Sequence, residues 1–173
     1  AALRVLDAGI MGGTEVGGKV YFYPDQTVSR SEFIVMAMTA AGISDLPACS
    51  ATVFADDGDI PASAKPYIGA AYKLGICDGW IKDGKQCFLP DEAVSVAEAA
   101  VITAGLLEIK TDGATAAWCD DGGLPAWASA GFGTMKAAGF VGNVPASGAR
   151  SGLDRRTCAV LMAAIMRYSA AKK

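Results

Sequence analysis

The sequence predicts an all-α domain with pseudo-threefold character, and two observations support this. The chain of 173 residues contains three related units, and each unit reads as a helix, a glycine-rich loop and a second helix. The second helices are apolar almost all round, which is typical of helices that are buried on every side. We therefore expect one domain over residues 1–173, with these three helices packed together at its centre.

The repeats are visible when the sequence is shifted against itself. At a shift of 66 residues, 9–32 falls on 75–98 without a gap, and at a shift of 64 residues, 54–76 falls on 118–140. The first unit begins inside what should be its first helix, and the third has a shorter loop. The predicted boundaries are about 1–46 for repeat one (N-terminally truncated), 53–110 for repeat two and 117–169 for repeat three.

The first helix of each complete repeat is predicted from its flanking residues. Pro61 and Pro125 stand where the first helical position is expected, behind acidic capping candidates such as Asp57. These helices are expected to run for about fourteen residues and to end at Gly75 and Gly139, since glycine is the usual residue after a helix C-terminus.

Capping boxes predict where the second helices begin. In Ser29-x-x-Glu32 and Ser95-x-x-Glu98 the serine oxygen accepts from a backbone N–H, and the glutamate reaches back to the serine N–H. Asp154-x-x-Thr157 is a weaker version of the same signal. These patterns predict central helices over 33–41, 99–107 and 158–166.

Composition excludes several classes of function. The chain has no histidine, so it lacks a Ser-His-Asp or Cys-His couple and imidazole metal ligands. Its net charge of −3 argues against binding nucleic acid. No apolar run reaches the roughly 18–20 residues of a membrane span, and no secretion signal opens the chain. We expect a protein without a cofactor or a metal that does not span a membrane.

The five cysteines have no zinc-like spacing and are better explained by disulfides. Cys77 and Cys87 bracket the loop of repeat two and could form a bridge across it. Cys49 and Cys119 lie near the starts of repeats two and three and could form a second bridge. Cys158 is predicted to be a buried free thiol in the third central helix. Disulfides would place the protein in an oxidising compartment outside the cytoplasm.

An ordered series of short motifs, repeated at constant spacing, resembles the S-layer homology (SLH) family. Repeat two carries it as Phe54-Ala-Asp56, Leu74-Gly75-Ile76, Phe88-x-Pro90 and the sequence VSVAE over 94–98. Repeat one carries VSRSEF over 28–33, and repeat three carries LDRRT over 153–157. The resemblance covers nearly the whole chain. It implies a three-pronged spindle around a central three-helix bundle.

The resemblance also implies a function. Such modules anchor a larger surface protein to the bacterial cell envelope, outside the cell, by binding an anionic and often pyruvylated secondary cell wall polysaccharide. The family's groove arginine falls on Arg30 and Arg155, whereas repeat two has Val96 at that position. The other glycan-binding candidates are capping residues and residues of the glycine-rich loops: Ser29, Asp154, Gly12, Gly13, Gly79, Trp80 and Gly142.

Elementary chemistry agrees with an anion site at these positions. A helix N-terminus offers free N–H groups and partial positive charge, and a guanidinium can bind a carboxylate with two hydrogen bonds. Two alternatives remain open. One is a protein–protein assembly module whose glycan grooves have degenerated, as Val96 suggests. The other is a hydrolase using Asp25 and Asp91, but these lie in repeated turn segments, so we expect no enzyme.

Overall fold

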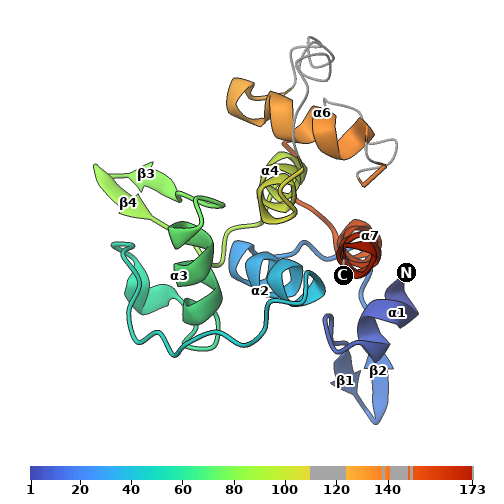
Figure 1. The fold of residues 1–173 in the computed structure, drawn as a ribbon. Helices are drawn as coiled ribbons and strands as arrows, with labels where there is room; N and C mark the ends of the chain where they lie inside the picture. Colours follow the sequence, from blue (N-terminus) through green and yellow to red (C-terminus); the bar gives the residue numbers. More distant parts are fainter. Residues whose placement is uncertain (110–123, 138, 141–147, 149, 173) are drawn as a thin grey trace.

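A computed structural model describes residues 1–109, 124–137, 139–140, 148 and 150–172 (Figure 1). Its α-helices are α1 (Ala2–Asp7), α2 (Arg30–Ala40), α3 (Lys65–Lys73), α4 (Val96–Leu106), α6 (Ser129–Ala137) and α7 (Arg155–Ala171). Two short 3-10 helices are η1 (Asp57–Asp59) and η2 (Ala126–Ala128). The strands are β1 (Thr14–Val16), β2 (Lys19–Tyr21), β3 (Trp80–Lys82) and β4 (Lys85–Cys87).

The prediction of an all-α domain is wrong, because the glycine-rich loops of repeats one and two fold into antiparallel β-hairpins. β1 pairs with β2, and β3 pairs with β4, each over three residues. The two-residue turns are Gly17-Gly18, with φ of 59° and 74°, and Asp83-Gly84, with φ of 51° and 73°. Positive φ at both central residues matches the twist of a hairpin, and Gly-Gly and Asp-Gly adopt it readily. The molecule is therefore mixed, with helices and two small sheets.

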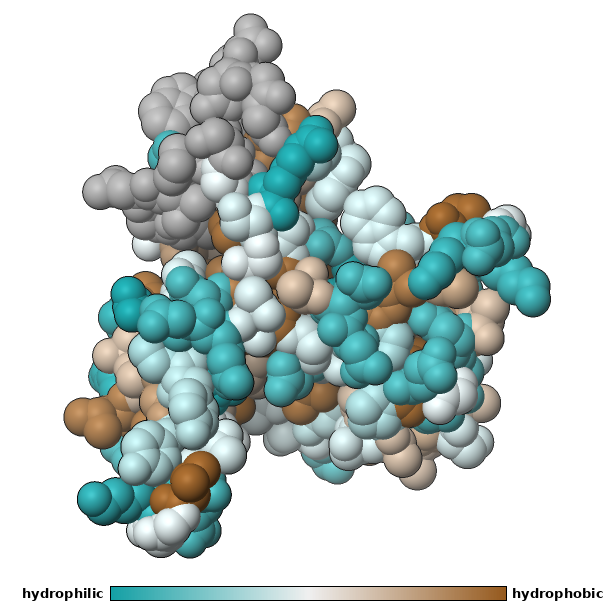
Figure 2. Space-filling model, turned by 180° about the vertical axis from the view of Figure 1, so that it is seen from behind, coloured by the Kyte–Doolittle hydropathy of each residue, from teal (hydrophilic) through white to brown (hydrophobic). Residues whose placement is uncertain are grey.

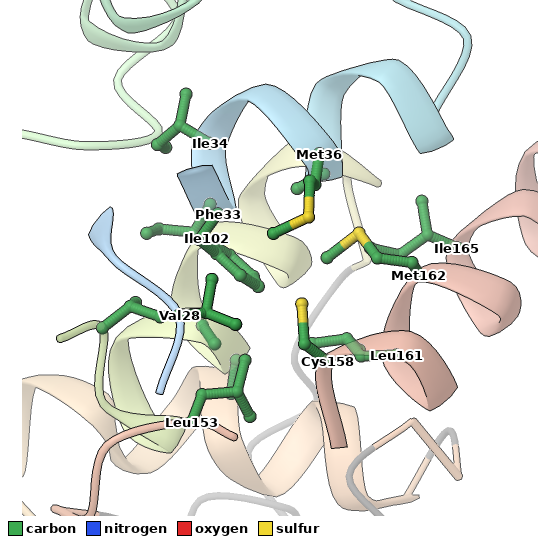
Figure 3. Close-up of a cluster of buried hydrophobic side chains, with 14 of the residues drawn as sticks. Val28, Phe33, Ile34, Met36, Ile102, Leu153, Cys158, Leu161, Met162 and Ile165 are labelled. Carbon is green, nitrogen blue, oxygen red and sulfur yellow. The ribbon is translucent and has the colours of Figure 1, made fainter. Parts of the chain in front are cut away.

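The outer helices interlock the three repeats. α1 packs on α7, α3 on α2, and α6 on α4, so each outer helix lies against the central helix of another repeat (Figure 1). Helices α2, α4 and α7 supply most of the buried apolar side chains at the centre, which include Phe33, Met36, Ile102, Cys158 and Met162 (Figure 3). No repeat can bury its own apolar surface alone, so we expect the three to fold together.

A closed ring of backbone hydrogen bonds joins the segments that precede the central helices. The Val28 N–H donates to the Leu153 carbonyl at 2.9 Å, the Leu153 N–H to Val94 at 2.7 Å, and the Val94 N–H to Val28 at 3.0 Å. These three residues occupy equivalent positions in the three repeats. The ring holds the N-terminal ends of α2, α4 and α7 together, which fixes where residues at these ends point.

The capping signals of the central helices are confirmed. Both capping boxes are formed, by Ser29 with Glu32 and by Ser95 with Glu98. The side chain of Asp154 accepts from the Thr157 N–H at 2.6 Å, the weaker version of the same cap. Each cap supplies an acceptor to N–H groups that have no partner within the helix.

The predicted starts of the outer helices are wrong. α3 begins at Lys65 rather than at Pro61, and α6 is likewise nine residues long. The carboxylate of Asp57 does not cap α3 but accepts from Thr52 and from the Lys65 ammonium, and these hydrogen bonds lower its pKa from 3.8 to about 2. A turn through Pro61 in repeat two, and the 3-10 helix η2 after Pro125 in repeat three, therefore take the place of the expected first helical turn.

Within the described residues, no helix combines the length and the apolar character that a membrane crossing requires. The surface is mixed in polarity, but the tip of hairpin β1–β2 carries apolar side chains and appears brown at the lower left of Figure 2. Val16 is 51% exposed and Val20 is 68% exposed.

Candidate functional site

The repeat-two groove is a cavity of about 330 Å³, lined by residues that include Arg30, Ile76, Trp80, Glu98, Ile102 and Trp127. Three repeats build it. Arg30 comes from the start of α2, Ile76 and Trp80 come from the loop and first strand after α3, and Glu98 and Ile102 from α4. Trp127 comes from η2 in repeat three.

Arg30 reaches from repeat one into the loop of repeat two and is almost wholly buried there. Its Nε donates to the Phe88 carbonyl at 2.8 Å, and its Nη1 donates to Glu98 Oε1 in an ion pair. The guanidinium carbon lies 5.1 Å from the centre of the Phe88 ring, within the range of a cation–π contact. Since the residue is only 6% exposed, the guanidinium mainly joins two repeats.

Two tryptophans form the outer part of the repeat-two groove. The ring centroids of Trp80 and Trp127 are 5.8 Å apart at an interplanar angle of 80°, an edge-to-face pair. Trp80 Nε1 donates to Glu98 Oε1 at 3.1 Å, so the carboxylate that pairs with Arg30 also holds this indole. Trp80 is 42% exposed and Trp127 is 50% exposed, so both rings offer free surface to a ligand.

The repeat-one groove is the equivalent cavity, about 290 Å³, lined by residues that include Ile10, Gly12, Glu32, Met36, Ser63 and Arg155. Arg155, at the start of α7, enters it as Arg30 enters the other groove. Its Nε donates to the Phe22 carbonyl at 2.8 Å, its Nη2 donates to the Gly12 carbonyl, and its guanidinium lies 5.0 Å from the Phe22 ring centre. Arg155 is half-buried and has no ion pair with any acid among the described residues.

The chain was compared with models of known protein families and with curated proteins, and neither comparison finds a match. The function is therefore inferred from the residues of the grooves.

The predicted glycan-binding residues divide between the grooves and the caps. Arg30, Gly79 and Trp80 line the repeat-two groove, and Gly12 and Arg155 line the repeat-one groove. Ser29 and Asp154 are engaged as helix caps. The position of Arg30 and Arg155 is filled in repeat two by Val96, which is 7% exposed. Gly142 lies outside the described residues.

Gly13 and Gly79, two further candidates at equivalent positions, have a packing role. A Cβ at Gly79 would lie 2.5 Å from the Cys87 carbonyl oxygen and 2.6 Å from Phe54 Cε1, and its φ is +72°. A Cβ at Gly13 would lie 2.3 Å from Val20 Cγ1. Both glycines therefore allow the chain to pass close to the second strand of its own hairpin. Around Gly12, by contrast, the space is open.

We expect Gly79→Ala to lower the free energy of unfolding by about 2 kcal/mol. The new methyl group would clash with the backbone of Cys87, and alanine would have to adopt a positive φ that it disfavours. Gly12→Ala is the matched control and is expected to change stability by less than about 0.5 kcal/mol. Urea denaturation of both variants measures the difference. Equal losses in the two variants would contradict the packing role of Gly79.

The disulfide predicted between Cys77 and Cys87 is absent, since both are free thiols. Cys77 lines the repeat-two groove, whereas Cys87 lines a different cavity beside Asp56 and Pro90. Burial raises the pKa of Cys77 to about 11, which keeps it protonated at neutral pH. Cys49 is also free, and its predicted partner, Cys119, lies outside the described residues.

Cys158 is buried and free, as predicted, and burial raises its pKa to about 12. Of the two carboxylates weighed for a hydrolase, Asp25 forms an exposed ion pair with Arg156 at 2.8 Å. No group of three or more cysteine, aspartate or glutamate side chains within the described ranges is placed to hold a metal ion.

Two groove residues were not among the predicted site residues. Glu98 was assigned only to its capping box, yet its second oxygen binds Arg30 and Trp80. Trp127 was assigned no role. The shift of 64 residues places Trp127 opposite Ser63, and that difference between otherwise matching repeats was the available signal.

Proposed function

We propose that this chain is a non-catalytic module that binds an anionic secondary cell wall polysaccharide and tethers a larger surface protein to the bacterial cell envelope. The observation that carries the proposal is Arg155, a half-buried arginine at the mouth of a groove of about 290 Å³, without an acidic partner in the described parts of the chain. The resemblance of the repeats to the SLH family supports the same function.

The chemistry of the repeat-one groove suits a carboxylate on a sugar. Two carbonyls and the Phe22 ring fix the guanidinium of Arg155, so little side-chain entropy is lost when a ligand binds. The other charged residue of the groove, Glu32, has one carboxylate oxygen held by the Ser29 N–H at 2.9 Å. Beside it, the open backbone at Gly12 allows a sugar to approach closely.

Co-sedimentation with purified sacculi, with and without their polysaccharide, tests this function. We expect the wild-type chain to bind only sacculi that retain the polysaccharide. Arg155→Met is expected to weaken that binding about 10-fold or more, since a charge-assisted hydrogen bond is lost. Binding should also fall as salt is raised, because salt screens an exposed charge pair.

The matched control is Arg167→Met, which removes the same charge from an exposed position on the same helix, α7. It is expected to bind like wild type. Binding that is independent of the polysaccharide, or an equal loss in both variants, would overturn the proposal. Because the described cysteines are free, the proposed location outside the cell rests on the repeats and not on disulfides.

One observation favours a second candidate, a protein-assembly module. Hairpin β1–β2 carries exposed apolar side chains at Val16, Val20 and Tyr21, and the last of these is 44% exposed. A Val20→Lys variant that retains polysaccharide binding but loses a protein partner would identify this surface as an assembly site.

A further inference from the structure

Three of the equivalent positions at which the two grooves differ change the aromatic content or the charge of the groove. The repeat-two groove has Trp80 where repeat one has Thr14, and it has Trp127 of repeat three where the repeat-one groove has Ser63 of repeat two. It also has the exposed carboxylate of Asp78 where repeat one has Gly12. The repeat-two groove is therefore both more aromatic and more acidic than the repeat-one groove.

Charge in the repeat-two groove disfavours an anion. Its charged lining residues are Arg30, Glu98 and Asp78, so one positive and two negative charges leave a formal charge of −1. The guanidinium of Arg30 is already engaged by Glu98 and by the Phe88 carbonyl. A ligand carboxylate would have to displace Glu98, which also caps Ser95 and holds Trp80.

The aromatic pair provides a rigid apolar corner. The edge-to-face geometry of Trp80 and Trp127 presents two nearly perpendicular walls. The hydrogen bond to Glu98 fixes Trp80. Trp127 is set by the close packing of α6 on α4, where a Cβ on Gly131 would lie 2.9 Å from Val101 Cγ2.

A pyranose ring matches these features. It has apolar C–H faces that stack on indole rings, and hydroxyl groups at its rim that donate to carboxylates. Ile76 and Ile102 add apolar lining, and Glu98 and Asp78 supply acceptors at its edge. The cavity of about 330 Å³ has room for one sugar residue.

We propose that the repeat-two groove binds an uncharged sugar residue of the polysaccharide against Trp80 and Trp127, while the anionic residue occupies the repeat-one groove. This inference rests on the proposed function and assigns the two grooves to different parts of one polymer. Engagement of both grooves by one chain would raise the overall affinity through effective concentration.

The test uses the extracted polysaccharide and the same polysaccharide after its carboxyl groups have been chemically reduced to alcohols. Calorimetric titration measures the affinity of the full chain for both. We expect wild type to bind the reduced polymer more weakly than the native one, but measurably. Trp127→Ser, which installs the residue that Ser63 supplies to the repeat-one groove, should lower affinity for the reduced polymer about 10-fold.

Arg155→Met should lower the affinity for the native polymer to that of the reduced polymer, and Arg167→Met should change neither. Circular dichroism checks that the exposed Trp127 is replaced without loss of fold. If the reduced polymer does not bind, or Trp127→Ser binds it like wild type, the inference is overturned while the proposed function stands. If the native polymer fails to bind as well, both are overturned.

Discussion

Replacing Arg30 by methionine is expected to lower the free energy of unfolding by about 3 kcal/mol. Methionine keeps most of the volume but leaves Glu98 without its cation in a site where the side chains of Arg30 and Glu98 are 7% and 12% exposed. Breaking one side of a buried ion pair costs more than the pair contributes, because the remaining charge stays desolvated. The Phe88 carbonyl also loses its donor. Urea denaturation at neutral pH measures the loss.

Arg155→Met is the internal comparison for this prediction. Arg155 makes the same two kinds of contact, to a carbonyl and to a phenylalanine ring, but it is half-buried and leaves no carboxylate behind. We expect it to lower stability by about 1 kcal/mol. Arg30→Met/Glu98→Gln should recover part of the Arg30→Met loss, since no unpaired charge remains. Equal losses at both arginines, without recovery in the double variant, would contradict the role given to Glu98.

Local signals in the sequence predicted the central helices well. Ser29 with Glu32 and Ser95 with Glu98 cap helices at the expected positions, and Cys158 is buried as its alignment with Phe33 and Ala99 suggested. Capping depends on residues three apart in the chain, so it can be read without knowing the fold.

The hairpins had a readable signal that the helix-loop-helix interpretation overlooked. Gly17-Gly18 and Asp83-Gly84 are the dipeptides that two-residue hairpin turns favour. The flanking strands are only three residues long and carry exposed side chains, so their apolar alternation was too weak to predict strands. The turn dipeptides and the short strands predict the pairing only in combination.

The environment of the arginines could not be read from sequence. Arg30 and Glu98 are 68 residues apart, and they meet only because the backbone ring places the start of α2 beside the loop of repeat two. The same holds for Trp127, which reaches the repeat-two groove because α6 packs on α4. Sites built between repeats depend on how the repeats pack, and periodic spacing alone does not contain that information.

Phe33→Ala is expected to lower the free energy of unfolding by about 4 kcal/mol, the range for removing a fully buried aromatic ring from a packed core. Phe33 is 0% exposed and belongs to the central cluster with Met36, Ile102 and Cys158 (Figure 3). The equivalent positions in the other central helices hold the smaller Ala99 and Cys158, also 0% exposed. We therefore expect one large side chain to fill space that the three equivalent positions share.

Ala99→Phe alone should destabilise the fold by about 1–3 kcal/mol through overpacking. In the Phe33→Ala background the same change should restore part of the lost stability, because the new ring enters the cavity from the neighbouring helix. A double-mutant cycle measured by urea denaturation gives the coupling free energy. Strict additivity of the two changes would mean that positions 33 and 99 do not share a cavity. A ring at position 99 could then not replace the ring of Phe33, although the two positions are equivalent in the repeats.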